Sequence, residues 1–152
     1  MKKDILNSML SIALKVKILR EWQESNCAKD HEFSERQQLA LELIKDFAPI
    51  TEKSLCKIFG LSFSSINDIV KRLAEMRLID TSDKTRGKPL ILTELGVAKL
   101  AKLKEASITR FGYLLDSMTE EEWIPLRKIL EKIDKNAERT IQQMVFDRYS
   151  SD

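Results

Sequence analysis

Two short amphipathic segments separated by a single glycine constrain the fold of this chain more than any other feature. Cys56 and Phe59 lie before Gly60, and Ile66 and Ile69 follow it at helical spacing. Each segment therefore has one apolar stripe, and a glycine between them can adopt the left-handed conformation of a tight turn. Cys56 is the small residue where the two helix backbones approach. The pattern predicts a helix-turn-helix.

Capping residues and a change of hydrophobic period predict the neighbouring elements. Ser34 with Gln37 has the pattern of a capping box that opens a helix. Past Met76 the apolar period changes from helical to extended, and a polar stretch containing Gly87 separates two short apolar runs. The predicted helices are about Asp4–Glu24, Ser34–Phe47, Thr51–Lys57, Ser62–Met76, Thr93–Leu115 and Thr119–Met144, with strands at Leu78–Ile79 and Leu90–Leu92. The helix that begins at Ser62 carries apolar residues at Phe63, Ile66, Ile69, Val70 and Leu73.

The composition favours one mainly helical domain. The chain has 152 residues, of which 43% are hydrophobic and 33% charged, enough for one sizeable core and a solvated surface. With three prolines and four glycines it lacks the many tight turns of an all-β sandwich. We expect a single domain over residues 1–152, mainly α with a small β-hairpin wing. Residues 34–93 form the winged helix-turn-helix, and residues 1–24 and 94–152 form flanking helices.

The first predicted helix carries two adjacent apolar rows instead of one stripe. The rows are Ile5, Met9, Ile12, Val16 and Leu19, and Leu6, Leu10, Leu14, Ile18 and Trp22. Such a helix is buried on more than one side, either by its own domain or by another subunit. Lys15, Lys17 and Arg20 follow the uncharged run without a small-residue cleavage site, so we expect neither export nor a membrane span.

Several function classes lack their usual residues. The chain has one histidine, His31, and two cysteines, Cys27 and Cys56, far apart in sequence. These residues predict no metal site, no disulfide framework and no Cys-His or Ser-His nucleophile. We expect a cytoplasmic protein that is not an enzyme and needs no cofactor.

Charge is distributed unevenly along a chain whose net charge is only +2. Residues 51–93 contain eight basic and five acidic side chains, whereas residues 25–50 and 94–152 each have an acidic excess. This local excess of positive charge favours a nucleic-acid surface on the helix-turn-helix over a solvated or protein-binding surface.

The segment from Ile50 to Gly96 resembles the MarR family of bacterial and archaeal transcriptional regulators. The resemblance rests on the helix-turn-helix, on the stretch Leu92-Thr93-Glu94-Leu95-Gly96 after the hairpin, and on Arg86, six residues before Leu92. In that family the helices flanking the winged domain form the dimer. The resemblance therefore implies a homodimeric regulator, expected to be a repressor, that binds a pseudo-palindromic operator in double-stranded DNA.

The resemblance also implies which residues contact DNA. The helix from Ser62 to Met76 would be the recognition helix in the major groove, and Arg86 would lie at the wing tip near a minor groove. The residue types agree independently, because short polar side chains can bind base edges and basic ones suit phosphates. The predicted DNA-binding residues are Ser62, Ser64, Ser65, Asn67, Asp68, Lys71, Arg72, Lys84, Thr85, Arg86 and Lys88.

Two departures from the family pattern support an alternative hypothesis. Lys84 occupies the place of a wing aspartate, with Asp83 one residue earlier, and the hairpin from Ile79 to Arg86 is short. Together with Asp68 on the recognition helix, this favours a winged-helix module that binds protein, or that binds DNA without sequence preference in a replication role.

Two further candidate sites follow from the resemblance. Cys27 is a candidate redox thiol, although its neighbours Lys29 and Asp30 have opposite charges and a plain, partly buried thiol is the other interpretation. Aromatic side chains at helix ends could line a pocket for a small aromatic effector, or could belong to the core. The candidate effector-pocket residues are Trp22, His31, Phe33 and Phe111.

Overall fold

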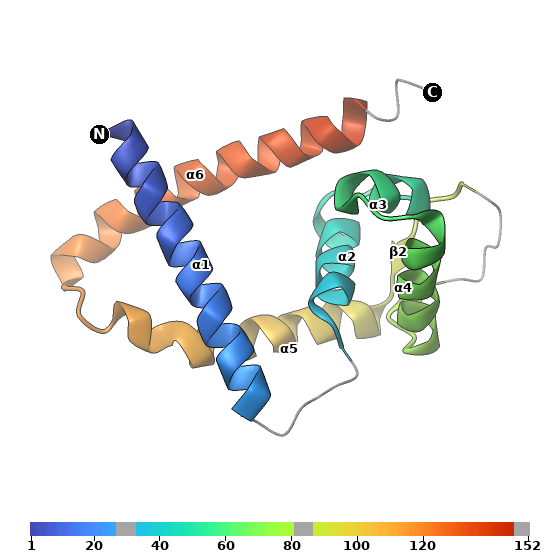
Figure 1. Ribbon diagram of the computed structural model, residues 1–152, viewed down its shortest axis with the longest axis horizontal. Helices are drawn as coiled ribbons and strands as arrows, with labels where there is room; N and C mark the ends of the chain where they lie inside the picture. Colours follow the sequence, from blue (N-terminus) through green and yellow to red (C-terminus); the bar gives the residue numbers. More distant parts are fainter. Residues whose placement is uncertain (27–32, 81–86, 148–152) are drawn as a thin grey trace. The chain divides into compact units, whose positions relative to one another are not determined.

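The structure, a computed structural model, describes residues 1–26, 33–80 and 87–147 and divides into two units. The first unit, Met1–Ser34, contains α1 (Lys2–Asn26). The second unit begins at Glu35 and contains all the other elements (Figure 1). These are α2 (Glu35–Asp46), α3 (Glu52–Phe59), α4 (Phe63–Glu75), β1 (Ile79–Asp80), β2 (Ile91–Leu92), α5 (Glu94–Phe111), the 3-10 helix η1 (Gly112–Leu115) and α6 (Glu120–Asp147).

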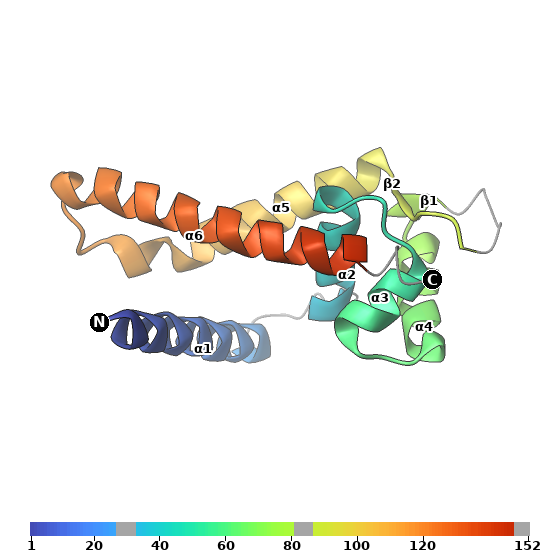
Figure 2. The same ribbon diagram turned by 90° about the horizontal axis from the view of Figure 1, so that it is seen from above.

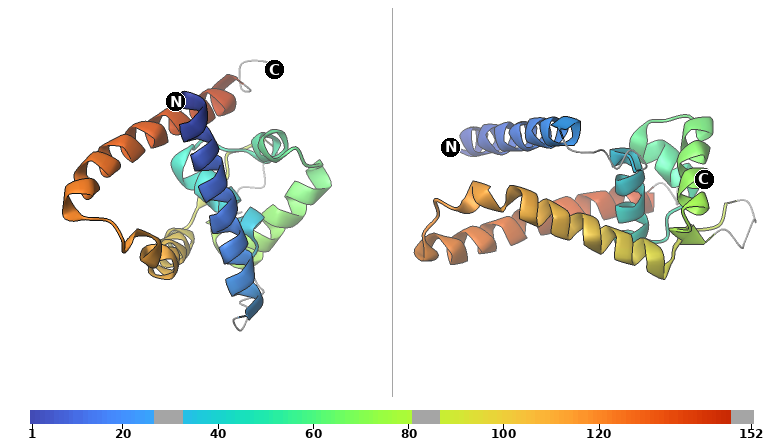
Figure 3. Two further views of the ribbon diagram at one scale, coloured as in Figure 1. Left: turned by 60° about the vertical axis from the view of Figure 1, so that its left-hand side comes forward. Right: turned by 90° about the horizontal axis from the view of Figure 1, so that it is seen from below.

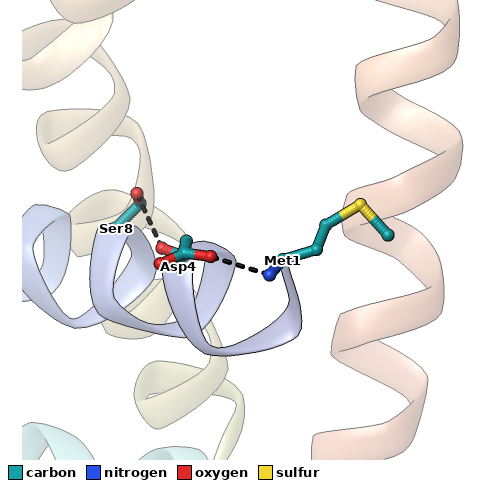
Figure 4. Close-up of polar contacts among 3 residues, drawn as sticks. All are labelled: Met1, Asp4 and Ser8. Atoms are coloured by element: carbon teal, nitrogen blue, oxygen red, sulfur yellow. Dashed lines mark hydrogen bonds and ion pairs between the residues drawn. The ribbon is translucent and has the colours of Figure 1, made fainter.

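Local polar contacts lie near both ends of α1. The N-terminal ammonium lies 2.7 Å from the Asp4 carboxylate, and the Ser8 hydroxyl donates a 3.0 Å hydrogen bond to the Asp4 carbonyl (Figure 4). Arg20 and Glu24 form an i,i+4 ion pair at 2.9 Å. Surface pairs of this kind contribute little to stability, and most helices in proteins are stabilised by packing of an apolar face.

The two apolar rows of α1 are largely exposed in this structure. The Leu10 and Leu14 side chains are each 61% exposed, and Trp22 is 63% exposed. The covering of these rows, by the rest of the domain or by another subunit, stays a prediction.

The core of the second unit lies where α2, α3, α4 and the hairpin meet the first part of α5. Contacts join α2 to α4, α5 and β2, and α4 to α3 and β1. The buried apolar residues of this core are Ala40, Leu41, Ile44, Ile50, Leu55, Ile66, Val70, Leu73, Leu78, Ile79 and Leu100. This is the predicted winged helix-turn-helix, and the mainly helical fold with a small hairpin is confirmed.

The wing is a two-stranded antiparallel hairpin. Ile79 pairs with Leu92 and Asp80 pairs with Ile91. Beyond the ladder, the Leu90 amide donates to the Ile50 carbonyl at 2.7 Å, which ties the chain before β2 to the segment between α2 and α3. Both strands begin one residue later than predicted, and at β1 the reason is visible, because the Leu78 amide donates to Leu73 at the end of α4.

The two long helices of the second unit lead away from the winged domain and back. α5 runs from the hairpin to η1, and α6 returns until it contacts α3, where Val145 is buried (Figures 1 and 2). The predicted helix through Leu115 ends instead at Phe111 and continues as the 3-10 turn η1 from Gly112, a residue with low helix propensity. None of the helices in the described ranges is both long and apolar enough to cross a bilayer.

Candidate nucleic-acid interface

The turn between α3 and α4 sets the direction of the candidate recognition helix. Thr51 opens α3 with a capping box, because its side chain accepts from the Ser54 amide and the Ser54 hydroxyl accepts from the Thr51 amide. Gly60 then adopts the left-handed conformation, with φ 63° and ψ 32°, and its amide and that of Leu61 both donate to Cys56. The glycine predicted to make this turn does so, since a side chain at that φ is disfavoured.

The start of α4 is capped by serine hydroxyls. The Ser62 hydroxyl accepts from the Ser65 amide at 3.2 Å, and the two hydroxyls lie 3.0 Å apart. The predicted N-cap is thus confirmed. Both hydroxyls keep hydrogen-bonding capacity beyond these bonds and both residues are exposed, so they remain available to a phosphate or a base edge.

The end of α4 is closed by a Schellman motif. Arg77 takes the left-handed conformation, with φ 58°, and its amide donates to Ala74 while the Leu78 amide donates to Leu73. Glycine is the usual residue at this position because it has no side chain to crowd the backbone. The motif turns the chain directly from α4 into β1.

The N-terminus of α5 is hydrogen-bonded to the residue that ends the Schellman motif. The Thr93 hydroxyl donates to the Arg77 carbonyl at 2.7 Å and accepts from the Gly96 amide at 3.0 Å. A side chain at Gly96 would overlap the Leu78 carbonyl oxygen and the Leu92 side chain. The Leu92–Gly96 stretch noted in the sequence therefore packs the start of α5 against the end of α4 and the wing.

These contacts leave one face of α4 buried and the other open. Ile66, Val70 and Leu73 are buried, and they recur at helical spacing. The opposite face is exposed and largely polar. It carries the predicted DNA-binding residues Ser64, Asn67, Asp68, Lys71 and Arg72, and one turn later Glu75. Arg72 lies 3.7 Å from Glu75, a loose exposed pair that a phosphate could replace.

One apolar residue of this helix lies outside the core. The Phe63 side chain is 56% exposed at the first position of α4. The buried stripe begins at Ile66, and Phe63 lies one turn before Asn67 at the edge of the exposed face. Sequence periodicity alone could not separate these placements, since an i−3 neighbour of a buried residue lies beside the buried stripe.

The remaining predicted wing residues are only partly described. Lys88 is exposed between Gly87 and the start of β2. Lys84, Thr85 and Arg86 lie outside the described residues. Their role in contacting DNA stays a prediction.

The candidate effector and redox residues are dispersed over the chain. Trp22 lies on α1 in the first unit, where Phe33 is half-buried, and Phe111 is half-buried at the end of α5 in the second. His31 and Cys27 lie outside the described residues. Cys56 is free and half-buried in α3, beside the turn that it was expected to pack. Within the described ranges no group of histidine, cysteine and acidic side chains could hold a metal ion.

Comparison with known proteins identifies the fold. No protein-family model matches the sequence, and neither does any curated protein. Solved structures do match. A MarR family protein from Bacillus stearothermophilus is similar at 19% identity and a TM-score of 0.65, over 88% of this chain and 93% of that one. The transcriptional regulator Tm0710 from Thermotoga maritima matches at 19% identity and a TM-score of 0.65, over 91% and 97%.

A third match was solved as a complex. Streptococcus pneumoniae FabT in complex with DNA is similar at 21% identity and a TM-score of 0.57, over 92% of this chain and 99% of that one. The matches span nearly the whole of each chain, including the helices outside the winged domain. The chain therefore has the winged-helix fold of MarR-family transcriptional regulators, as the sequence resemblance predicted.

Proposed function

We propose that this protein is a sequence-specific DNA-binding transcriptional regulator that acts as a homodimer on a pseudo-palindromic operator and represses transcription. The observation that carries the proposal is the exposed face of α4. Its apolar side is held by the core, so Ser64, Asn67 and Lys71 face outward from a helix of a size that fits the major groove. Such a regulator works where chromosomal DNA lies, in the cytoplasm.

A similar structure supports the same interpretation. FabT, which shares this fold, was solved in complex with DNA. The excess of basic side chains in residues 51–93 suits a polyanion, and non-specific phosphate contacts would position the helix before any base is read. The residues of α4, and not the fold alone, carry the proposal.

Control by a small aromatic ligand is a further part of the proposal. It rests on the family resemblance and on Trp22, His31, Phe33 and Phe111, and it predicts that a ligand changes DNA affinity rather than serving as a substrate.

The test is selection of bound fragments from randomised duplex DNA at near-physiological salt. We expect one enriched pseudo-palindrome for the wild type. Asn67→Ala should relax preference at one base-pair position in each half-site, at a cost of about 1 to 3 kcal/mol, because an amide can pair with an adenine edge. Lys71→Ala should weaken all sequences alike and reduce the slope of log affinity against log salt by about 2, since the homodimer loses one phosphate contact in each half-site.

A matched lysine change is the control. Lys128→Ala alters an exposed lysine on α6, outside the winged domain, and should leave both the affinity for DNA and its salt dependence unchanged. Failure to enrich any sequence, together with binding that varies only with salt, would favour the alternative hypothesis of a module for non-specific DNA or protein contact.

A further inference from the structure

An exposed aromatic ring stands at the leading end of the recognition helix. Phe63 is the first residue of α4 and is 56% exposed, whereas the apolar residues of the next turns, Ile66 and Val70, are buried. The capping bonds of Ser62 hold the backbone of this first turn in place. A large apolar surface at this position does not contribute to the core, and it lies within the surface that the proposed function assigns to DNA.

The ring shares one side of the helix with the candidate base-reading amide. Phe63 and Asn67 are four residues apart, so their side chains lie on the same side one turn from each other, and Lys71 follows one turn later. Four residues of helix advance about 6 Å, which is between one and two base-pair steps of about 3.4 Å. The two side chains could therefore contact neighbouring base pairs.

The major groove offers one natural apolar group, the C5-methyl of thymine. The amide of an asparagine pairs best with the N6 and N7 edge of adenine, and an aromatic ring next to it matches a thymine methyl. We propose that Phe63 is a specificity-determining residue that contacts the C5-methyl of a thymine one or two base pairs from the position read by Asn67. This inference rests on the proposed function, and it names the base chemistry that the operator must contain.

A protein partner is the other surface that could cover an exposed phenylalanine. The basic excess of residues 51–93 and the exposed Lys71 on the same side of α4 favour a polyanion instead. Lysine is also depleted in the centres of protein interfaces.

The experiment removes the methyl group and nothing else. In the duplex selected by the wild type, each thymine of both half-sites is replaced in turn by deoxyuridine, and affinity is measured by fluorescence anisotropy. At one position, deoxyuridine should weaken wild-type binding about fourfold per half-site and about sixteenfold when both are replaced, the effect of losing one buried methyl group twice. Replacing that base by 5-methylcytosine, paired with guanine, should bind better than unmethylated cytosine.

The Phe63→Ala variant completes the cycle. It should bind the thymine and deoxyuridine duplexes equally, whereas Phe63→Leu should keep part of the discrimination because it retains an apolar side chain. Ile91→Ala is the matched control, since Ile91 is also a large exposed apolar residue, on β2, and should keep the full methyl effect. Unchanged thermal unfolding of Phe63→Ala shows that the variant is folded, as expected for an exposed residue.

The outcomes separate this inference from the proposed function. A specific palindrome with no methyl-sensitive thymine, or with equal sensitivity in the wild type and in Phe63→Ala, would overturn the role of Phe63 and leave the regulator intact. Equal methyl discrimination by the wild type and Phe63→Ala would leave a protein partner as the surface that covers the ring. Absence of any selected sequence would overturn both proposals.

Discussion

At the scale of single residues, two positions that look unrelated in the sequence share a left-handed backbone conformation. Gly60 and Arg77 end α3 and α4 respectively, and both adopt left-handed conformations, with φ 63° and 58°. Glycine suits this conformation because it has no side chain, whereas the arginine at position 77 is strained by it. The sequence predicted the role of Gly60, but nothing local marks Arg77, because its conformation follows from how α4 must turn into β1.

Opposite substitutions at these two positions should have opposite effects. Arg77→Gly should raise the free energy of unfolding by about 0.5 to 1 kcal/mol, because relief of left-handed strain exceeds the added entropy of the unfolded chain. Gly60→Ala should lower it by a similar amount, about 1 kcal/mol, although no atom lies within 4 Å of the new methyl group. Urea denaturation monitored by circular dichroism measures both changes. Shifts of the same sign in the two variants would contradict this explanation.

At the scale of elements, the contact between α5 and the end of α4 holds the wing in place. The Thr93 hydroxyl links the Arg77 carbonyl to the first turn of α5, and Gly96 allows the helix to approach the Leu78 carbonyl. The sequence identified Thr93 and Gly96 as the start of a helix. The reason that position 96 is a glycine appears only when the Leu78 carbonyl, from the segment before β1, is placed against it.

Gly96→Ala should therefore be strongly destabilising. Its methyl group meets backbone, which cannot move aside as a flexible side chain can, so the free energy of unfolding should fall by about 2 kcal/mol or more. Gly112→Ala is the matched control. Gly112 has right-handed helical angles, φ −54° and ψ −38°, and open space around it, so alanine should be neutral or raise stability by up to about 1 kcal/mol. Thermal unfolding of the two variants compares them directly, and equal losses would refute the close approach.

At the scale of the whole molecule, both units carry large exposed apolar side chains. On α1 they include Leu10 and Leu14, and around η1 and on α6 they include Leu114, Ile124 and Ile129. Exposed apolar surface of this extent is typical of an interface between subunits. The proposed homodimer would cover it, and Figure 3 shows in further views the long α5 and α6 on which part of this surface lies.

Charge introduced on α1 should separate the proposed dimer. We expect the wild type to sediment as a dimer at micromolar concentration, and Leu10→Lys/Leu14→Lys to raise the dissociation constant about a hundredfold or more. A two-fold interface contains each change twice, and every 1.4 kcal/mol is a tenfold effect. Ile91→Lys, which puts the same charge on an exposed apolar site of the wing, should remain dimeric. A monomeric wild type would refute the homodimer and leave the winged helix itself unaffected.

Local sequence signals predicted much of the second unit, since its elements are bounded by features that act over a few residues. Thr51, Ser62 and Thr93 cap the helices that they were expected to open, and Gly60 makes the expected turn. Local signals do not decide every position, because the same spacing can fit two placements. Phe63 fits an apolar stripe by spacing but lies at its edge, and Gly112 ends α5 although apolar residues continue the helical period.

The candidate site also contains residues that the sequence predicted and one that only the structure placed there. Residue types and spacing predicted that Ser64, Asn67 and Lys71 share an exposed face, because helical geometry places them there once the buried stripe is known. Which large apolar side chain stays outside the core depends on contacts between α4 and its neighbours, and no local signal reports it. Phe63 therefore enters the candidate site only from the structure.

The sequence by itself determined the helix-turn-helix, the hairpin after it and the polar face of α4, because capping, glycine conformation and apolar period act within one or two turns of chain. Tertiary structure alone decided the left-handed Arg77, the close approach at Gly96 and the exposure of Phe63. Each of these depends on segments that are distant in sequence, and packing selects one arrangement among several that local energies leave nearly equal.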